Sequence, residues 1–191
     1  MKIVFASNNA HKVAEIQQIL GDDFEVVTLR ECGITEDIPE TAETLEGNAC
    51  LKAQYIYERL GVNCFADDTG LEVDALGGTP GVRSARYATD EGHDSVANNA
   101  LLLKNMSGVE GRSAQFRTVI ALILDGREHL FEGIVRGEIC RDYAGGEGFG
   151  YDPLFVPDGH SRTFAQMSMA EKSAISHRGR AVAKLVAFLR G

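Results

Sequence analysis

The stretch Gln115–Cys140, QFRTVIALILDGREHLFEGIVRGEIC, holds two long runs of strand-forming residues separated by Asp125-Gly126. An Asp-Gly pair between such runs is a strong signal for a two-residue β-hairpin turn, because both turn positions need positive φ. The sequence therefore predicts two long neighbouring strands, Gln115–Leu124 and Glu128–Cys140.

Shorter elements alternate on the N-terminal side of this hairpin. Apolar runs predict three strands, and helical spacing of apolar residues predicts two helices, each ending at a glycine. The strands are Lys2–Ala6, Phe24–Leu29 and Val62–Ala66, and the helices end at Gly21 and Leu60. Alternating strands and helices joined to a hairpin indicate an α/β fold built on a mixed sheet.

The C-terminal side adds helices and one short strand. We expect a helix over Ser95–Met106 and a strand over Leu154–Val156. Ser168 and Glu171 have the spacing of a capping box, so a helix should begin there, and a last helix should end near Arg190. With no linker and no internal repeat, residues 1–191 are predicted to form a single domain.

Composition limits the function classes. The chain carries 28 acidic and 19 basic residues, a net charge of −9, which disfavours binding to a polynucleotide but not to a small anion. No apolar run approaches the ~20 residues that span a bilayer, so we expect no membrane partner. The four cysteines are scattered, which argues against a zinc site or a disulfide framework and favours the cytoplasm.

Four polar segments follow strands or occupy tight loops, where α/β proteins build sites. The first is SNNAHK, Ser7–Lys12, at the start of the first helix. Backbone N–H groups at a helix N-terminus bind phosphate, and Ser7, Asn8 and Lys12 can add side-chain donors. The alternative is an ordinary helix cap beside an exposed lysine.

The second segment is acidic and contains Glu40, Glu43 and Glu46. Magnesium takes one or two carboxylates and completes its shell with phosphates and waters, so this segment is a candidate for a metal ligand. The alternative is an acidic helix N-terminus that the macrodipole favours.

The third segment is FADDTGLEVDALGGTPGVRSARY, Phe65–Tyr87, in which we expect the strand to end at Asp67 and Asp68. Neighbouring residues of an extended chain point in opposite directions, so the two carboxylates are not a matched acid/base pair. One can face the site while the other orients it, and the alternative is a solvated turn.

The fourth segment combines GFGYDP, Gly148–Pro153, with AEKSAISHRG, Ala170–Gly179. Phe149 and Tyr151 can offer a ring for a base to stack on. In one helix Lys172 and His177 would lie ~140° apart, so their joint use needs a break, which Ser176 can supply. Alternatively, Phe149 is a core residue and His177 a surface histidine.

Together, SNxxHK, FADDTGLEVDALGGTPGVRSARY and GFGYDPLF…EKSAISHRG resemble the inosine triphosphate pyrophosphatase family over residues 7–179, in the family's order. The resemblance implies a long mixed sheet flanked by helices, two lobes that enclose a central cleft, and a homodimer. It also implies Mg²⁺-dependent hydrolysis of ITP, dITP and XTP to the monophosphate and pyrophosphate, which clears non-standard purine nucleotides.

Site residues follow from the same resemblance. Asp68 is implied to be the proton acceptor and a magnesium ligand. Substrate contacts are implied for Ser7, Asn8, Asn9, Ala10, His11, Lys12, Thr69, Phe149, Gly150, Tyr151, Asp152, Lys172, His177 and Arg178. Gly47 stands where the family commonly has glutamate, so the second metal ligand is assigned to Glu40, twelve residues before Lys52, with Glu43 as the alternative.

Two other functions stay open on the sequence. Related families with this architecture act on modified pyrimidine or methylated nucleotides. A non-catalytic nucleotide-binding protein could keep the same pocket, although binding alone would not need the Asp68 carboxylate.

Overall fold

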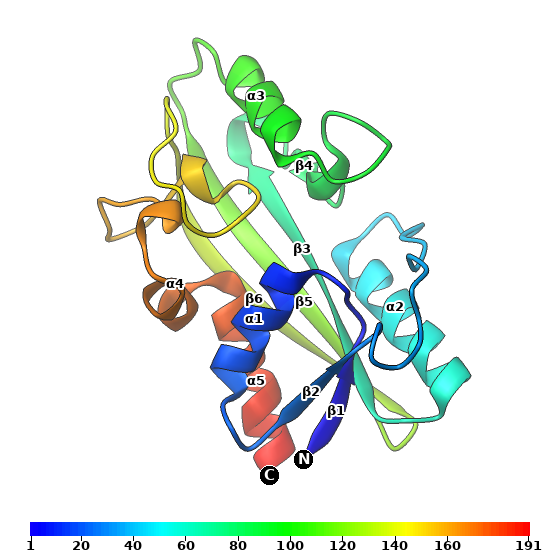
Figure 1. Cartoon of the computed structure of the whole chain (residues 1–191). Coiled ribbons are helices and arrows are strands. Elements are labelled where there is room, and N and C mark those ends of the chain that lie inside the picture. The colour runs from blue at the N-terminus through cyan, green and yellow to red at the C-terminus, as the bar shows by residue number, and fades with distance from the viewer. The chain divides into compact units, whose positions relative to one another are not determined.

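The computed structural model describes all of residues 1–191 and has a seven-stranded mixed sheet (Figure 1). The strands are β1 (Lys2–Phe5), β2 (Glu25–Thr28), β3 (Cys64–Val73), β4 (Pro80–Gly81), β5 (Ser113–Leu124), β6 (Arg127–Ile139) and β7 (Phe155–Pro157). The helices are α1 (Ala10–Leu20), α2 (Leu45–Leu60), α3 (Ser95–Asn105), α4 (Met169–Ile175) and α5 (His177–Arg190). Short 3₁₀ turns are η1 (Asp74–Leu76), η2 (Ser84–Arg86), η3 (Asp152–Leu154) and η4 (Phe164–Gln166).

The strand order is β2-β1-β3-β5-β6-β7, and β4 pairs with β3. β1 is parallel to both β2 and β3, whereas the β3–β4 and β6–β7 pairs are antiparallel. The predicted α/β fold on a mixed sheet is therefore confirmed. None of the helices has the length and apolar character needed to cross a membrane.

The chain divides into two compact units. Unit 1 consists of Met1–Asp68, Thr118–Gly133 and His177–Gly191, and unit 2 of Thr69–Arg117 and Ile134–Ser176. Strands β3, β5 and β6 each contribute residues to both units.

In unit 1, helices cover both faces of the sheet. Phe65 of β3 belongs to an apolar cluster with residues of α1 and α5, including Ile16 and Val182. The neighbouring Cys64 donates a hydrogen bond from its thiol to the carbonyl of Ala53 in α2, at 3.3 Å. Because consecutive strand residues point to opposite faces, α1 and α5 cover one face of β3 and α2 covers the other.

Unit 2 has its own apolar core. It joins β3, α3, β5, β6 and the segment around β7, through residues such as Leu71, Leu102, Phe116, Val135 and Phe155. The Phe116 and Phe155 rings meet edge to face, with centroids 4.7 Å apart.

The local signals for turns and helix ends are confirmed. Asp125 and Gly126 have φ of 49° and 76°, as a turn with two positive φ values requires. Ser168 and Glu171 form the capping box that starts α4. α4 ends before Ser176 and α5 begins at His177, so the predicted break exists.

One boundary prediction is wrong: β3 does not end at the aspartate pair but continues to Val73. Its second half pairs with β4 through Leu71 opposite Gly81. A Cβ on Gly70 would lie 2.6 Å from the Gly81 carbonyl oxygen, so glycine allows the two strands to approach. Both aspartates therefore lie inside a strand.

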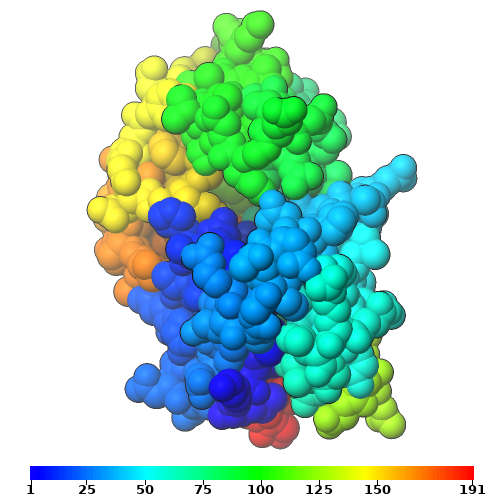
Figure 2. Space-filling view, turned by 45° about the vertical axis from the view of Figure 1, so that its right-hand side comes forward, coloured from blue at the N-terminus to red at the C-terminus, as the bar shows by residue number.

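The irregular segment between β2 and α2 lies on the surface of unit 1 (Figure 2). Asn8 holds its first part, because its amide donates to the Ile34 carbonyl and accepts from the Arg30 N–H. Asn48 of α2 holds its last part by accepting a hydrogen bond from the Ala42 N–H at 2.9 Å. A Cβ on Gly47 would lie 2.6 Å from the Ala42 Cβ, so this packing suits the glycine that departs from the family pattern.

Candidate active site

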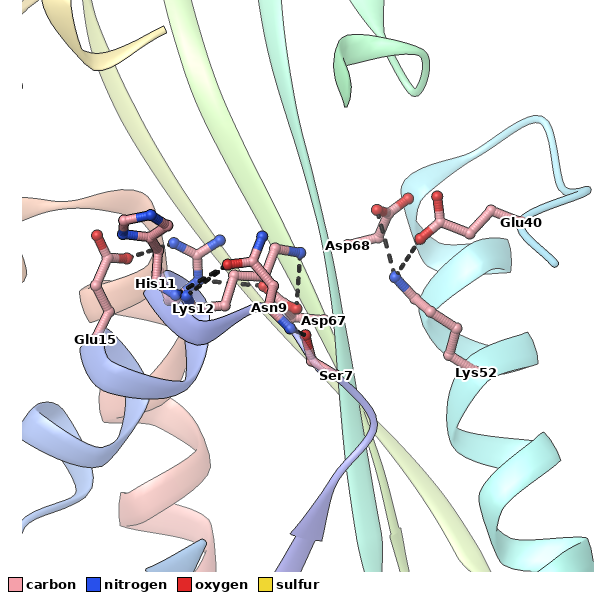
Figure 3. Close-up of polar contacts among 10 residues, drawn as sticks. Ser7, Asn9, His11, Lys12, Glu15, Glu40, Lys52, Asp67 and Asp68 are labelled. Atoms are coloured by element: carbon pink, nitrogen blue, oxygen red, sulfur yellow. Dashed lines mark hydrogen bonds and ion pairs between the residues drawn. The ribbon is translucent and has the colours of Figure 1, made fainter. Parts of the chain in front are cut away.

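The alternation of β3 separates the two aspartates. Asp67 shares the direction of Phe65 and faces α1 and α5, whereas Asp68 shares the direction of Cys64 and faces α2. Figure 3 shows the two carboxylates pointing apart, each with a lysine beside it. The prediction that they do not form a matched pair is confirmed.

The Asp67 group contains two carboxylates and two cations. Asp67 Oδ1 accepts from Lys12 Nζ at 3.0 Å and Oδ2 accepts from Arg178 Nε at 3.2 Å. Arg178 Nη1 also donates to Glu15 Oε2 at 2.5 Å. Asp67, Glu15 and Arg178 are almost fully buried, so this ionic group balances its charge inside the protein.

Electrostatics in the Asp67 group favour the ionised form of Asp67. Burial by itself raises the pKa of Asp67, but the charges of Lys12, Arg178 and Lys52 outweigh it and hold that pKa well below its usual range. Burial lowers the pKa of Lys12, and Asp67 only partly offsets the effect. The positive charge of Lys12 thus depends mainly on one carboxylate, that of Asp67.

The Asp68 group is built differently, because two carboxyl groups share one ammonium group (Figure 3). Lys52 Nζ lies 2.7 Å from Glu40 Oε1 and 3.6 Å from Asp68 Oδ1. Asp68 Oδ2 is buried and has no hydrogen-bond partner. Burial raises the pKa of Asp68, with Lys52 and Lys12 opposing the shift and Glu40 adding to it.

This donor set fits a hard divalent cation. Asp68 Oδ2 is buried without a hydrogen-bond partner, which destabilises the folded protein. A second carboxylate, that of Glu40, contacts the same lysine ammonium group as Asp68. Magnesium prefers such oxygen ligands and needs only one or two of them from the protein. Asp68 and Glu40 could hold it, whereas Glu43 is exposed. Their roles as metal ligands stay a prediction.

The segment Ser7–Lys12 starts α1 as predicted. Asn9 caps the helix, since its Oδ1 accepts from the N–H groups of His11 and Lys12 at 3.0 and 3.1 Å. Ser7 Oγ accepts from the Asn9 N–H at 3.1 Å. Asn9, Ala10 and His11 are exposed, but the Asn8 amide is engaged with the Ile34 and Arg30 backbone. A phosphate contact by this segment stays a prediction.

In unit 2, the loop Phe149–Asp152 is tied down by its own residues. Asp152 Oδ2 accepts from the Phe149 N–H at 3.0 Å and from Lys172 Nζ at 2.7 Å. Lys172 Nζ also lies 4.8 Å from the centre of the Phe149 ring. The structure thus brings together three residues for which the resemblance implies substrate contacts.

The other predicted residues lie as follows. The Tyr151 side chain is buried in the core, where its hydroxyl donates to the Ser84 carbonyl at 2.6 Å. Thr69 is half-buried and begins unit 2, to which Lys172 also belongs.

His177 and Arg178 begin α5 in unit 1, and both are buried. Arg178 donates to the carboxylates of Asp67 and Glu15, and its predicted contact with the base stays a prediction.

Sequence reasoning missed Glu15 and the pairing of Asp67. Glu15 is 4% exposed and lies next to Ile16 on the buried side of α1. The only feature of the sequence that could have indicated its burial is its position beside the apolar residues of this helix. The partners of Asp67 are 55 and 111 residues away, and no local pattern links them.

Known proteins resemble this chain over nearly its whole length. A model of the Ham1 family matches residues 3–188. A dITP/XTP pyrophosphatase from Flavobacterium psychrophilum is 50% identical over 100% of both chains, and one from Porphyromonas gingivalis is 54% identical over 98% of this chain and 97% of its own. The structure of the Staphylococcus aureus Ham1 protein has a TM-score of 0.89 and 41% identity, covering 100% of this chain and 99% of its own. The chain belongs to the Ham1 family.

Proposed function

We propose that this chain is a Mg²⁺-dependent nucleoside-triphosphate pyrophosphatase that hydrolyses ITP, dITP and XTP to the monophosphate and pyrophosphate. The observation that carries the proposal is the Asp68 group, in which a buried carboxylate oxygen has no partner and Glu40 faces the same lysine. Relatives named dITP/XTP pyrophosphatase match the whole chain at about half identity, which supports the substrate class.

In this proposal the residues near Asp68 have separate roles. Asp68 orients the attacking water and accepts its proton. Lys52 keeps Glu40 and Asp68 together. Lys12 and the first turn of α1 bind phosphate oxygens, with Asp67 holding Lys12 in place. The bond between the α- and β-phosphates breaks, and pyrophosphate leaves.

Magnesium belongs to the proposal as a cofactor. Asp68 and Glu40 would hold it, and when bound it supplies positive charge to the phosphates and makes water more acidic. Because a triphosphate carries several negative charges into a protein of net charge −9, added positive charge is needed in the site.

Base selection is assigned to unit 2. The Phe149 ring offers a stacking surface beside the Lys172 ammonium group. Hypoxanthine and xanthine present an acceptor at position 6, whereas adenine presents a donor there. A protein donor at this position would leave adenine mismatched, and polar mismatches of this kind discriminate strongly.

We also propose a homodimer in the cytoplasm, as the family resemblance implies. All four cysteines carry free thiols, which suits a reducing compartment. Sedimentation velocity of the purified chain would test the dimer, and a sedimentation coefficient expected for 20.7 kDa would reject it.

The deciding experiment measures pyrophosphate release from ITP, XTP, dITP, GTP and ATP at equal concentration, with Mg²⁺ or with EDTA. We expect metal-dependent release from the first three and almost none from GTP and ATP. Turnover of modified pyrimidine nucleotides instead would change the substrate class, and binding without turnover of any nucleotide would indicate a non-catalytic protein.

Variants then test the roles within the Asp68 group. Asp68→Asn should abolish turnover and leave nucleotide binding largely intact. Glu40→Gln should raise the Mg²⁺ concentration required for half-maximal rate, whereas Glu43→Gln, on an exposed residue of the same segment, should not. Full activity of Asp68→Asn would remove this residue from the mechanism.

A further inference from the structure

Two consecutive asparagines of α3, Asn98 and Asn99, tie this helix to two different segments of unit 2. Asn98 Oδ1 accepts from the Ala88 N–H at 2.8 Å, and its Nδ2 donates to the Ala85 carbonyl at 2.9 Å. Asn99 Nδ2 donates instead to the Gly150 carbonyl at 2.9 Å. Both residues are buried, at 5% exposure, but they hold different segments, and Asn98 uses both its amide oxygen and its amide nitrogen whereas the bond of Asn99 to Gly150 uses the nitrogen.

Packing alone does not explain Asn99. Its Oδ1 is buried and accepts no hydrogen bond, so the amide leaves one polar atom unmatched. An unmatched buried acceptor destabilises a protein, and an apolar side chain of similar size would avoid this cost. What the amide supplies here is the hydrogen bond to Gly150.

Gly150 lies in the middle of the loop that carries Phe149. Its φ is +60°, so the backbone turns sharply at this residue. The flanking residues are held by their own bonds, Phe149 through its N–H to Asp152 and Tyr151 through its hydroxyl to Ser84. Asn99 is the residue of α3 that bonds the backbone between them.

We infer that Asn99 is a positioning residue that fixes the Gly150 peptide and, through it, the orientation of the Phe149 ring for a bound purine. The inference rests on the proposed function, because it takes this loop as the place where the base binds. In Figure 2 the green surface that includes α3 adjoins the yellow surface of the residues just before Phe149, in keeping with the bond between Asn99 and Gly150.

The consequence concerns selectivity more than rate. Asn99 does not touch the phosphates in this scheme, so its loss should weaken base recognition and spare the chemistry at Asp68. A loop that moves by a fraction of an ångström can still stack a purine, but it holds the base less accurately against the donor proposed for position 6.

The first test compares Asn99→Ala and Asn99→Leu with Asn98→Ala as the matched control. Asn99→Leu is similar in size but has no donor for the Gly150 carbonyl. Both Asn99 variants should raise KM for ITP and lower the ITP-over-ATP ratio of kcat/KM by about tenfold, while kcat for ITP falls less than threefold. Asn98→Ala should lower thermal stability at least as much and leave the ratio unchanged.

The second test needs no nucleotide. Hydrogen exchange followed by mass spectrometry should show faster exchange in a peptide spanning residues 147–154 for both Asn99 variants. For Asn98→Ala the faster exchange should appear in residues 84–90 instead. This readout stays informative if the wild-type chain fails to hydrolyse ITP, so failure of the proposed function and failure of this inference can be told apart.

Specific results would overturn the inference. An Asn99→Leu variant with wild-type selectivity and exchange would do so, because the donor would then be dispensable. An equal loss of selectivity in Asn98→Ala would do so as well, because it would assign the effect to general destabilisation of α3.

Discussion

The buried polar groups of unit 1 are mostly charged. The loop Phe149–Asp152 of unit 2, in contrast, is held largely by neutral hydrogen bonds. In unit 1, Asp67 and Glu15 each bond to the Arg178 guanidinium. In unit 2, the Asn99 amide and the Tyr151 hydroxyl bond to backbone carbonyls, and one ion pair, Asp152–Lys172, accompanies them.

The difference indicates two kinds of vulnerability. A buried charge that loses its partner destabilises a protein strongly, because the remaining charge stays away from water. A neutral hydrogen bond costs less to lose, but its geometry defines where a loop lies. Unit 1 should therefore be sensitive to changes of charge, and the loop of unit 2 to changes of shape.

The largest effect is expected for Arg178→Met in unit 1. This change leaves Asp67 and Glu15 buried without their shared cation, which should lower the free energy of unfolding by about 3–5 kcal/mol. Urea unfolding followed by circular dichroism measures it. The triple variant Arg178→Met, Asp67→Asn, Glu15→Gln should recover much of the loss, and a single-variant loss below about 1 kcal/mol would contradict the ionic account.

A shape change in unit 2 ranks second. Gly148 has φ of 72°, and a Cβ there would lie 2.1 Å from Asp152 Oδ2. Gly148→Ala should therefore move the loop and cost about 2 kcal/mol, from strain and from crowding of the carboxylate. Gly146→Ala is the matched control, because its Cβ would meet no atom within 4 Å. Equal melting temperatures for the two variants would argue against a shape-sensitive loop.

Tyr151→Phe should have a smaller effect that changes with pH. Burial raises the pKa of Tyr151, and the nearby Tyr87 adds to the shift. In the unfolded chain the phenol has a pKa of about 10. As the pH rises, the unfolded chain therefore loses the phenol proton before the folded chain does. The hydrogen bond should contribute about 1 kcal/mol at neutral pH. Above pH ~10 the stability of the wild type should fall by up to roughly 1.4 kcal/mol per pH unit on account of this residue.

The phenylalanine variant lacks this titration, so the two unfolding free energies should converge as the pH rises from about 9 to 11. Urea unfolding at a series of pH values measures the convergence. A constant gap between the two proteins would indicate that Tyr151 titrates alike in both states.

The smallest effect is expected at the surface of unit 1. Glu36 accepts from the Arg59 guanidinium at 2.6 Å, but both side chains are about half exposed. Solvent screens such pairs, so Glu36→Gln should leave the melting temperature unchanged within error. A clear decrease would mean that charge matters across all of unit 1 and not only in its interior.

Much of the fold could be predicted because its signals are local. The Asp125-Gly126 turn, the Ser168–Glu171 capping box and the break at Ser176 each depend on a few adjacent residues. The extension of β3 to Val73 could not, because it depends on β4 and on the close approach that Gly70 allows.

The site shows the same limit. The separation of Asp67 from Asp68 follows from strand alternation, and the pairing of Lys52 with Glu40 agrees with a spacing of twelve residues. The bond between Arg178 and Glu15 joins residues 163 apart, and the bond between Asn99 and Gly150 joins residues 51 apart. Such contacts arise only when the whole chain is folded, so a reading of short segments could not reveal them.

Unit 1 is assembled from three separate stretches, and the last of these begins at His177. A ribosome makes the chain from its N-terminus, so Glu15 and Asp67 emerge long before Arg178 exists. Until Arg178 leaves the exit tunnel, the nascent chain carries two carboxylates that cannot yet be buried at low cost. We therefore expect unit 1 to complete its folding only after residues 177–191 have been made, whereas unit 2, which closes at Ser176, has all its residues earlier.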